Sequence, residues 1–174
     1  MSGPRSRTAI QSAIRGRGFT LRELIIVLVI VGIISAIALT RTGNDPVMLS
    51  TQVNQLAGDI RYVQALAMTQ GQRYRINLTA TGYTFTRADA GGTAVIHPAT
   101  GSTAQINWNS GVTVALPPTN LPGNLVAFDG RGAPYTNNLA TTALGLGNTA
   151  TITLSKGGAN ATVTIQPFTG KVTP

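Results

Sequence analysis

The chain has 174 residues, a length that suits one globular domain and an appendage. It contains no cysteine, which excludes a disulfide framework and thiol chemistry. Its formal net charge is +8, but four of the thirteen basic residues lie within residues 1–18, and the other nine face five acidic residues. This modest surplus permits a weak attraction to DNA or anionic surfaces without indicating a nucleic-acid-binding protein.

The most apolar stretch of the chain runs from Leu24 to Leu39, is interrupted only by Gly32 and Ser35, and carries no charge. Counted from residue 19, and at ~1.5 Å per residue, it is long enough to cross a bilayer core of about 30 Å as a helix. We therefore expect residues 19–40 to form a transmembrane helix.

A secretory signal peptide is the alternative interpretation of this region. Residues 1–18 contain four arginines and would be its basic part, followed by the apolar part. The apolar run is longer than the ~7–15 residues usual in a signal peptide, and Arg22 and Glu23 interrupt its start. Both observations disfavour the signal peptide.

The sequence GFTLREL at residues 18–24 resembles the N-terminal signature of type IV pilins and of the pseudopilins of type II secretion. In that family a prepilin peptidase cuts after the glycine and methylates the new N-terminus. The resemblance implies that residues 1–18 are a basic leader that is removed, that the cut follows Gly18, and that Phe19 becomes the N-methylated first residue. Arg22 departs from the family, which more often has an apolar residue there.

Glu23 is a carboxylate set directly before the most apolar residues, where a charge near membrane depth costs roughly 2.5–3.5 kcal/mol. The resemblance implies a role for it in filament assembly. Packing of such helices places a freed α-amine inside an apolar bundle, and a buried charge is tolerable only when it is paired. The alternative is that Glu23 reaches the membrane interface beside Arg22.

A second helix is predicted over residues 45–71. Asp45 and Pro46 suit its first turn, and Gly71 suits its end. Apolar residues recur at alternating steps of four and three, which defines one buried helix face. They are Leu49, Val53, Leu56, Ile60, Val63 and Ala67.

Residues 72–174 have the composition of a β-domain, because short alternating runs are separated by turn residues. The candidate strands are Arg73–Thr79, Tyr83–Ala88, Thr93–His97, Ala104–Trp108, Val112–Leu116, Leu125–Phe128, Ala150–Ser155 and Ala161–Gln166. Thr81-Gly82 and Lys156-Gly157-Gly158 are predicted hairpin turns. The predicted fold is α+β: a long N-terminal helix, half in the membrane and half soluble, packed against an antiparallel β-sandwich-like domain.

This part of the chain is similar to the GspH/FimT group of minor pilins and pseudopilins. The similarity lies in LAGDIRYVQALAMTQGQRYRINL, at the junction of helix and first strand, and in VAFDGRGAPY and VTIQPFTGKV, near the end.

No enzyme constellation is visible, so we expect neither catalytic residues nor a cofactor. His97 has no second histidine or cysteine with which to form a metal site, and it is interpreted as a loop residue. The aspartates of the soluble part are scattered, and nothing pairs them for acid–base chemistry. Asp129 to Gly132 is interpreted as a hairpin turn, with calcium binding as a remote alternative. The glycine-rich residues 145–150 are interpreted as a loop.

Two basic residues near the C-terminus, Arg131 and Lys171, are candidate DNA contacts. In one branch of the resembled family, minor pilins capture DNA through basic residues that include a Gly-Arg-Val segment. The matching segment here is Gly170-Lys171-Val172, and lysine keeps the charge but loses the fork geometry that grips phosphate. The simpler interpretation is scattered solvated charge.

The sequence thus predicts a non-enzymatic minor pilin or pseudopilin. Its expected partners are other pilins or pseudopilins, the prepilin peptidase and an inner-membrane assembly platform. The expected location is the bacterial inner membrane, with a single span and a periplasmic C-terminal domain, and then a filament in the periplasm or at the cell surface. The alternatives are a DNA-capturing minor pilin of a competence pilus and an uncleaved, membrane-anchored periplasmic binding domain.

Overall fold

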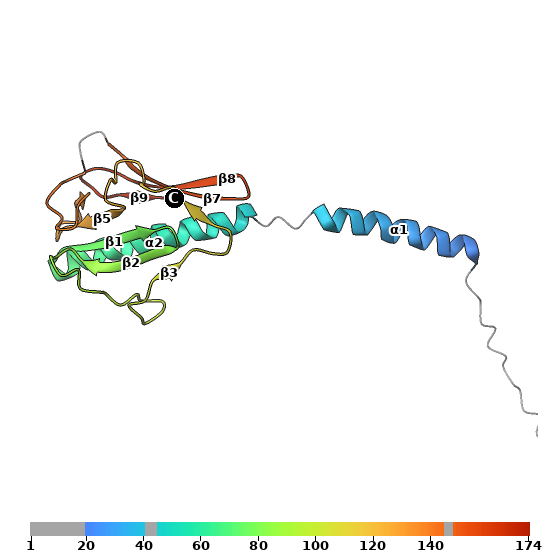
Figure 1. Ribbon diagram of the computed structural model, residues 1–174, viewed down its shortest axis with the longest axis horizontal. Coiled ribbons are helices and arrows are strands. Elements are labelled where there is room, and N and C mark those ends of the chain that lie inside the picture. The colour runs from blue at the N-terminus through green and yellow to red at the C-terminus, as the bar shows by residue number, and fades with distance from the viewer. Residues whose placement is uncertain (1–19, 41–44, 145–147) are drawn as a thin grey trace, which may run out of the picture. The chain divides into compact units, whose positions relative to one another are not determined.

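The computed structural model describes residues 20–40, 45–144 and 148–174, with the side chains of residues 37–40 and 45 left out (Figure 1). The chain divides into two compact units, Met1–Thr42 and Gly43–Pro174. The described part of the first unit is dominated by the helix α1, Leu21–Thr40. The second unit contains the helix α2 and all nine strands found among the described residues.

Helix α2, Asp45–Gln70, has the predicted bounds and the predicted buried face. All six residues of the predicted stripe are buried, and Ala57 lies with them. Gly71 ends the helix with a φ of 62°, and the N–H of Gln72 donates to the carbonyl of Ala67. This bond and the left-handed glycine are typical of a Schellman C-cap.

The first sheet has the strand order β3-β2-β1-β5-β6, and every pairing in it is antiparallel. Its members are β1 Tyr74–Thr79, β2 Gly82–Arg87, β3 Ile106–Asn107, β5 Leu125–Phe128 and β6 Pro134–Tyr135. Burial alternates along β1, so one face of this strand points toward the core.

The second sheet has the order β4-β7-β8-β9 and is also antiparallel. Its members are β4 Thr113–Val114, β7 Ala150–Lys156, β8 Ala159–Ile165 and β9 Val172–Thr173. The turn of Gly157 and Gly158 joins β7 to β8, and both glycines have positive φ. This confirms the predicted hairpin.

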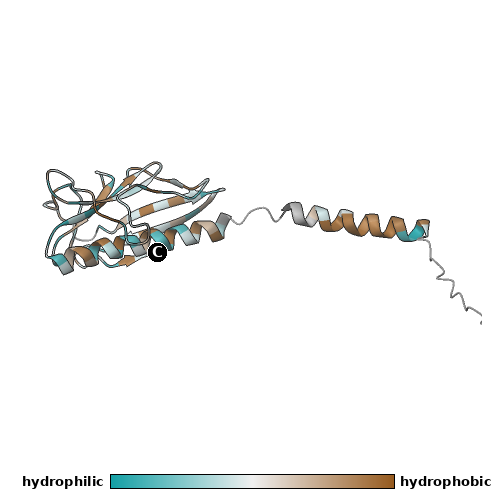
Figure 2. Cartoon of the chain, turned by 90° about the horizontal axis from the view of Figure 1, so that it is seen from below, coloured by the Kyte–Doolittle hydropathy of each residue, from teal (hydrophilic) through white to brown (hydrophobic). Residues whose placement is uncertain are grey.

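Helix α2 contacts strands of both sheets: β1 and β5 of the first, and β7, β8 and β9 of the second. Figure 2 shows α2 running along one side of the strands. The buried face of α2 joins side chains of both sheets in one hydrophobic core, which includes Tyr83, Phe128, Ile152 and Ile165. The fold is therefore α+β, as predicted, with two antiparallel sheets sharing one helix.

Two details of the predicted β-region are wrong. Gly82 belongs to β2 and not to the turn, because a Cβ at this position would lie 2.0 Å from the carbonyl oxygen of Ile106 in β3. Residues 93–97 form only isolated bridges, at Ala94 and His97. The outer edge of β2 is shared, since Gly82 and Tyr83 pair with β3 while Thr86 pairs with Ala94. Neither neighbour can therefore extend into a full strand.

Candidate functional site

The start of α1 carries an N-terminal cap that sequence reasoning missed. The hydroxyl of Thr20 accepts a hydrogen bond from the N–H of Glu23 at 3.3 Å, and the Thr20 carbonyl accepts from Glu23 and Leu24. Thr-x-x-Glu is the signature of a capping box, and it was present in the sequence. A carboxylate in the first turn also stabilises a helix by about 0.3–1 kcal/mol through the helix dipole. Glu23 thus has a local role at the helix N-terminus.

The described side chains of α1, from residue 21 to residue 36, are all exposed. They are apolar around the whole helix after Arg22 and Glu23, as the colouring of Figure 2 shows. A helix that is apolar on all sides normally lies inside a protein core or a membrane. This unit therefore offers an apolar surface that calls for an apolar environment or a packing partner. Gly18 and Phe19, the predicted cleavage residues, lie outside the described residues.

No helix in the described ranges qualifies as a membrane span by length and apolarity together. The transmembrane segment expected over residues 19–40 stays a prediction.

Arg131 lies in the hairpin turn between β5 and β6, and Asp129 closes this turn as predicted. One carboxylate oxygen of Asp129 accepts the N–H groups of Arg131 and Ala133 at 2.9 and 3.0 Å. The other accepts the Tyr135 hydroxyl at 3.2 Å and the Arg131 guanidinium at 3.4 Å. Partial burial raises the pKa of Asp129, but these hydrogen bonds outweigh it and leave the pKa below its ordinary value. Both oxygens therefore serve the turn itself.

The turn that carries Lys171 lies beside the turn that carries Arg131. The side-chain amide of Gln64 donates to the carbonyls of Gly132 and Thr169 at 2.8 and 3.0 Å, which joins the two turns to α2. Lys171 is exposed, and 85% of the Arg131 side chain is accessible. The structure thus brings the two candidate cations onto neighbouring turns.

His97 is buried, so its interpretation as a plain loop residue is wrong. Its Nε2 atom lies 3.0 Å from Oδ1 of Asp59 on α2, and the Tyr83 hydroxyl donates to Oδ2 of Asp59 at 2.5 Å. The N–H of Ala99 donates to Nδ1 at 3.2 Å, so Nε2 is the nitrogen assigned the proton. Both ring nitrogens are occupied, and the imidazole has no lone pair left to act as a general base.

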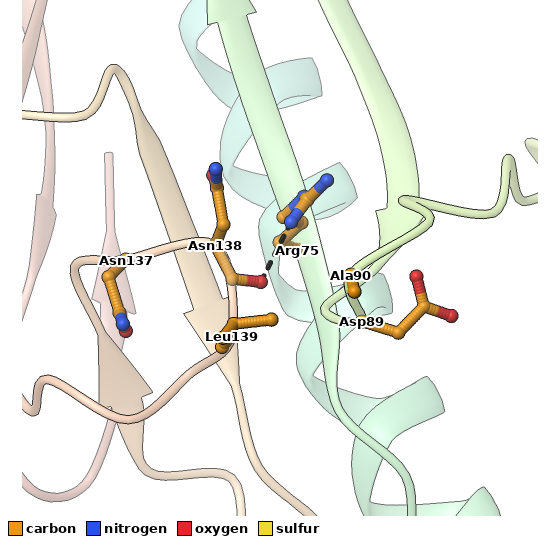
Figure 3. Close-up of a pocket in the computed structure, with 6 residues that line it drawn as sticks. All are labelled: Arg75, Asp89, Ala90, Asn137, Asn138 and Leu139. Atoms are coloured by element: carbon orange, nitrogen blue, oxygen red, sulfur yellow. Dashed lines mark hydrogen bonds between the residues drawn. The ribbon is translucent and has the colours of Figure 1, made fainter.

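A cavity of about 470 Å³ lies between the loops at residues 89–90 and 137–139 (Figure 3). Arg75 of β1 donates to the Asn138 carbonyl at 2.7 Å and to the Thr86 hydroxyl at 2.8 Å. The Asp89 carboxylate points away from Arg75 and accepts the N–H of Gly92. The charged groups of this cavity hold its own loops. Across the described ranges, no three potential metal-ligating side chains gather.

Comparison with protein families decides what this arrangement is. The family model of the type II transport protein GspH matches residues 52–170, and that of the prokaryotic N-terminal methylation motif matches residues 15–39. The chain belongs to the GspH family. It is a pilin-type subunit of the class that forms type II secretion pseudopili or type IV pili, and both resemblances found in the sequence are confirmed.

Solved structures share the fold. The minor pseudopilin EpsH from the type 2 secretion system of Vibrio cholerae has a TM-score of 0.51 and 12% identity, over 72% of this chain and 94% of that chain. The type IV minor pilin FimU of Pseudomonas aeruginosa strain PAO1 has a TM-score of 0.47 and 14% identity, over 72% and 86%. No curated protein matches the sequence significantly.

Proposed function

We propose that this GspH-family chain is made as a membrane-anchored precursor, is cleaved after Gly18, and enters a filament as a minor subunit. The observation that carries the proposal is α1, a helix whose described side chains are exposed and almost wholly apolar, within a segment that matches the N-terminal methylation motif. Such a helix suits storage in a membrane and then packing into a helical bundle. The globular unit, with its own core, would face the periplasm and later the filament surface.

In this proposal the carboxylate of Glu23 has two roles. It supports the first turn of α1, next to the Thr20 cap. In the filament it would offset the α-amine of a neighbouring Phe19, because an unpaired charge in an apolar bundle is costly. The prepilin peptidase and an inner-membrane assembly platform would be the processing and assembly partners. The match to a type II transport family favours the secretion pseudopilus.

The charge of Glu23 can be separated from its capping role. Glu23→Gln keeps a residue that suits a capping box but removes the charge, whereas Thr20→Ala removes the cap and keeps the charge. We expect Glu23→Gln to leave processing intact and to reduce the amount of chain in sheared filaments, and Thr20→Ala to reduce it less. Normal incorporation of Glu23→Gln would contradict the pairing role and would favour a carboxylate that reaches the interface beside Arg22.

A further inference from the structure

A groove separate from the cavity of Figure 3 lies where the β5–β6 hairpin, the segment at Leu144 and the turn at Phe168 meet. Its volume is about 460 Å³. Pro134 and Leu144 in its lining are buried, Tyr135 is half-buried, and Arg131 stands at the rim. The groove is thus mainly apolar, with a cation at its edge.

Phe168 is the most exposed aromatic side chain among the described residues that line this groove, with 64% of the residue accessible. Its φ is +61°, a region that bulky residues rarely adopt. The N–H of Thr169 donates to the Pro167 carbonyl at 2.7 Å, which closes a three-residue turn around Phe168. The fold therefore holds a large aromatic ring in solvent at a conformational cost, a combination that is enriched at binding sites.

The charge around the groove indicates the chemistry of its occupant. Arg131 lines it, and Lys171 stands on the adjoining turn. Among the described side chains of the globular unit, the acids are committed: Asp59 is bonded to His97, Asp129 to its own turn, and Asp89 to Gly92. A second copy of this unit has little acidic surface to offer, so a complementary carboxylate comes from a different protein.

The shape of the groove favours a peptide over a nucleic acid. Two cations give few phosphate contacts, and phosphate contacts supply most of the affinity for DNA. A concave apolar lining with one aromatic and one arginine at the rim suits an inserted apolar side chain, because aromatic and arginine residues are the usual anchors of protein interfaces.

We propose that this groove binds a segment of another filament subunit in which a carboxylate stands beside an apolar side chain. The apolar side chain lies against Pro134, Leu144 and Phe168, and the carboxylate pairs with Arg131, with Lys171 adding to the attraction. The identity of the partner as a filament subunit rests on the proposed function. The groove then sets which neighbour this minor subunit accepts.

Photocrosslinking of the full chain in cells tests this proposal. Benzoylphenylalanine in place of Phe168 keeps an aromatic ring at the groove, and the same residue in place of Ile96, exposed in another loop, is the control. The expected product at position 168 joins this chain to another filament subunit. Peptide mapping should place the bond within two or three residues of an Asp or Glu that neighbours an apolar residue.

Charge variants make the test specific. Arg131→Gln should lower the crosslink yield at least about fivefold, because the partner carboxylate loses its ion pair. Arg131→Lys should retain about half of it. Lys156→Gln removes the same charge from a residue whose ammonium group lies beside Met48, near the other end of α2, and should change the yield less than about twofold.

The outcomes separate this proposal from the proposed function. Sheared filaments that contain the chain but lack the crosslink at position 168 would contradict the groove alone. Crosslinks to nucleic acid, to a second copy of this chain or to a segment without a carboxylate would also overturn it. Absence of the chain from filaments would contradict the proposed function, and a protein crosslink that then involves no filament subunit would contradict the partner.

Discussion

Nε2 of His97 lies 3.0 Å from Oδ1 of Asp59, and this contact joins the loop after β2 to the middle of α2. Tyr83 of β2 donates to the other oxygen of the same carboxylate at 2.5 Å. His97 also stacks on Phe85, with ring centroids 5.0 Å apart. One carboxylate thus ties together the helix, the first sheet and the loop that leads toward β3.

Tyr83→Phe should destabilise the fold by about 1.5–3 kcal/mol at neutral pH, because a hydrogen bond to a charged and largely buried carboxylate is lost. The full chain in detergent micelles can be unfolded with urea to measure this. Tyr62→Phe is a control, since Tyr62 lies on α2 and its ring also packs near Phe85. An equal effect of both substitutions would contradict a special role for the Tyr83–Asp59 bond.

The same variant should change the alkaline dependence of stability. Burial, then the bond to Asp59, raises the pKa of Tyr83 far above its ordinary value. A tyrosine of the unfolded chain loses its proton near pH 10, so above that pH the folded state binds more protons than the unfolded state. The free energy of unfolding therefore falls as pH rises beyond about 10. Tyr83→Phe should make this fall shallower, by up to one proton, and an unchanged slope would contradict the assignment.

Gly170→Ala tests the close approach of the two turns that carry Lys171 and Arg131. Gly170 has a φ of 60°, and a Cβ there would lie 2.6 Å from the Gly132 carbonyl oxygen. Gly101 has a φ of 63° and open space around it, so Gly101→Ala carries only the cost of the backbone conformation. That cost is about 1–2 kcal/mol. Gly170→Ala should destabilise the fold by clearly more, as measured by urea unfolding, and equal costs would mean that the turns lie further apart.

Titration with duplex DNA at several salt concentrations tests the alternative role of Arg131 and Lys171. Each phosphate contact contributes a salt slope of about 0.9, so a site using both residues would lose about two contacts in the Arg131→Ala, Lys171→Ala double variant. We expect no such loss, since only two cations meet on these turns and they flank an apolar groove. A wild-type slope that falls by two contacts in the double variant would instead support a DNA-capturing subunit.

The elements that the sequence predicted well are those whose signal is local. The stripe of α2 and its end at Gly71 depend on helical spacing and on one left-handed residue. Strand β5 has the predicted bounds, and β1, β2, β7 and β8 differ from theirs by one or two residues. The two-residue strands β6 and β9 were absent from the candidate strands, because their pairing depends on neighbours that are distant in sequence and not on a pattern of their own.

The site followed the same division. The GFTLREL motif predicted the family because its chemistry is contiguous in sequence. The contact of His97 with Asp59 spans 38 residues, and no local pattern indicates it. The exposure of Phe168 depends on a turn whose positive φ falls on a phenylalanine and not on a glycine, so residue type gave no warning.

The N-terminus of the protein isolated from cells with a prepilin peptidase tests the central claim most directly. Intact-mass and N-terminal analysis should find a chain that begins at Phe19 and carries one N-methyl group, because the methylation motif spans the junction after Gly18. A chain that still begins at Met1, or one cut beyond Leu39, would contradict a processed filament subunit and leave an anchored or secreted domain.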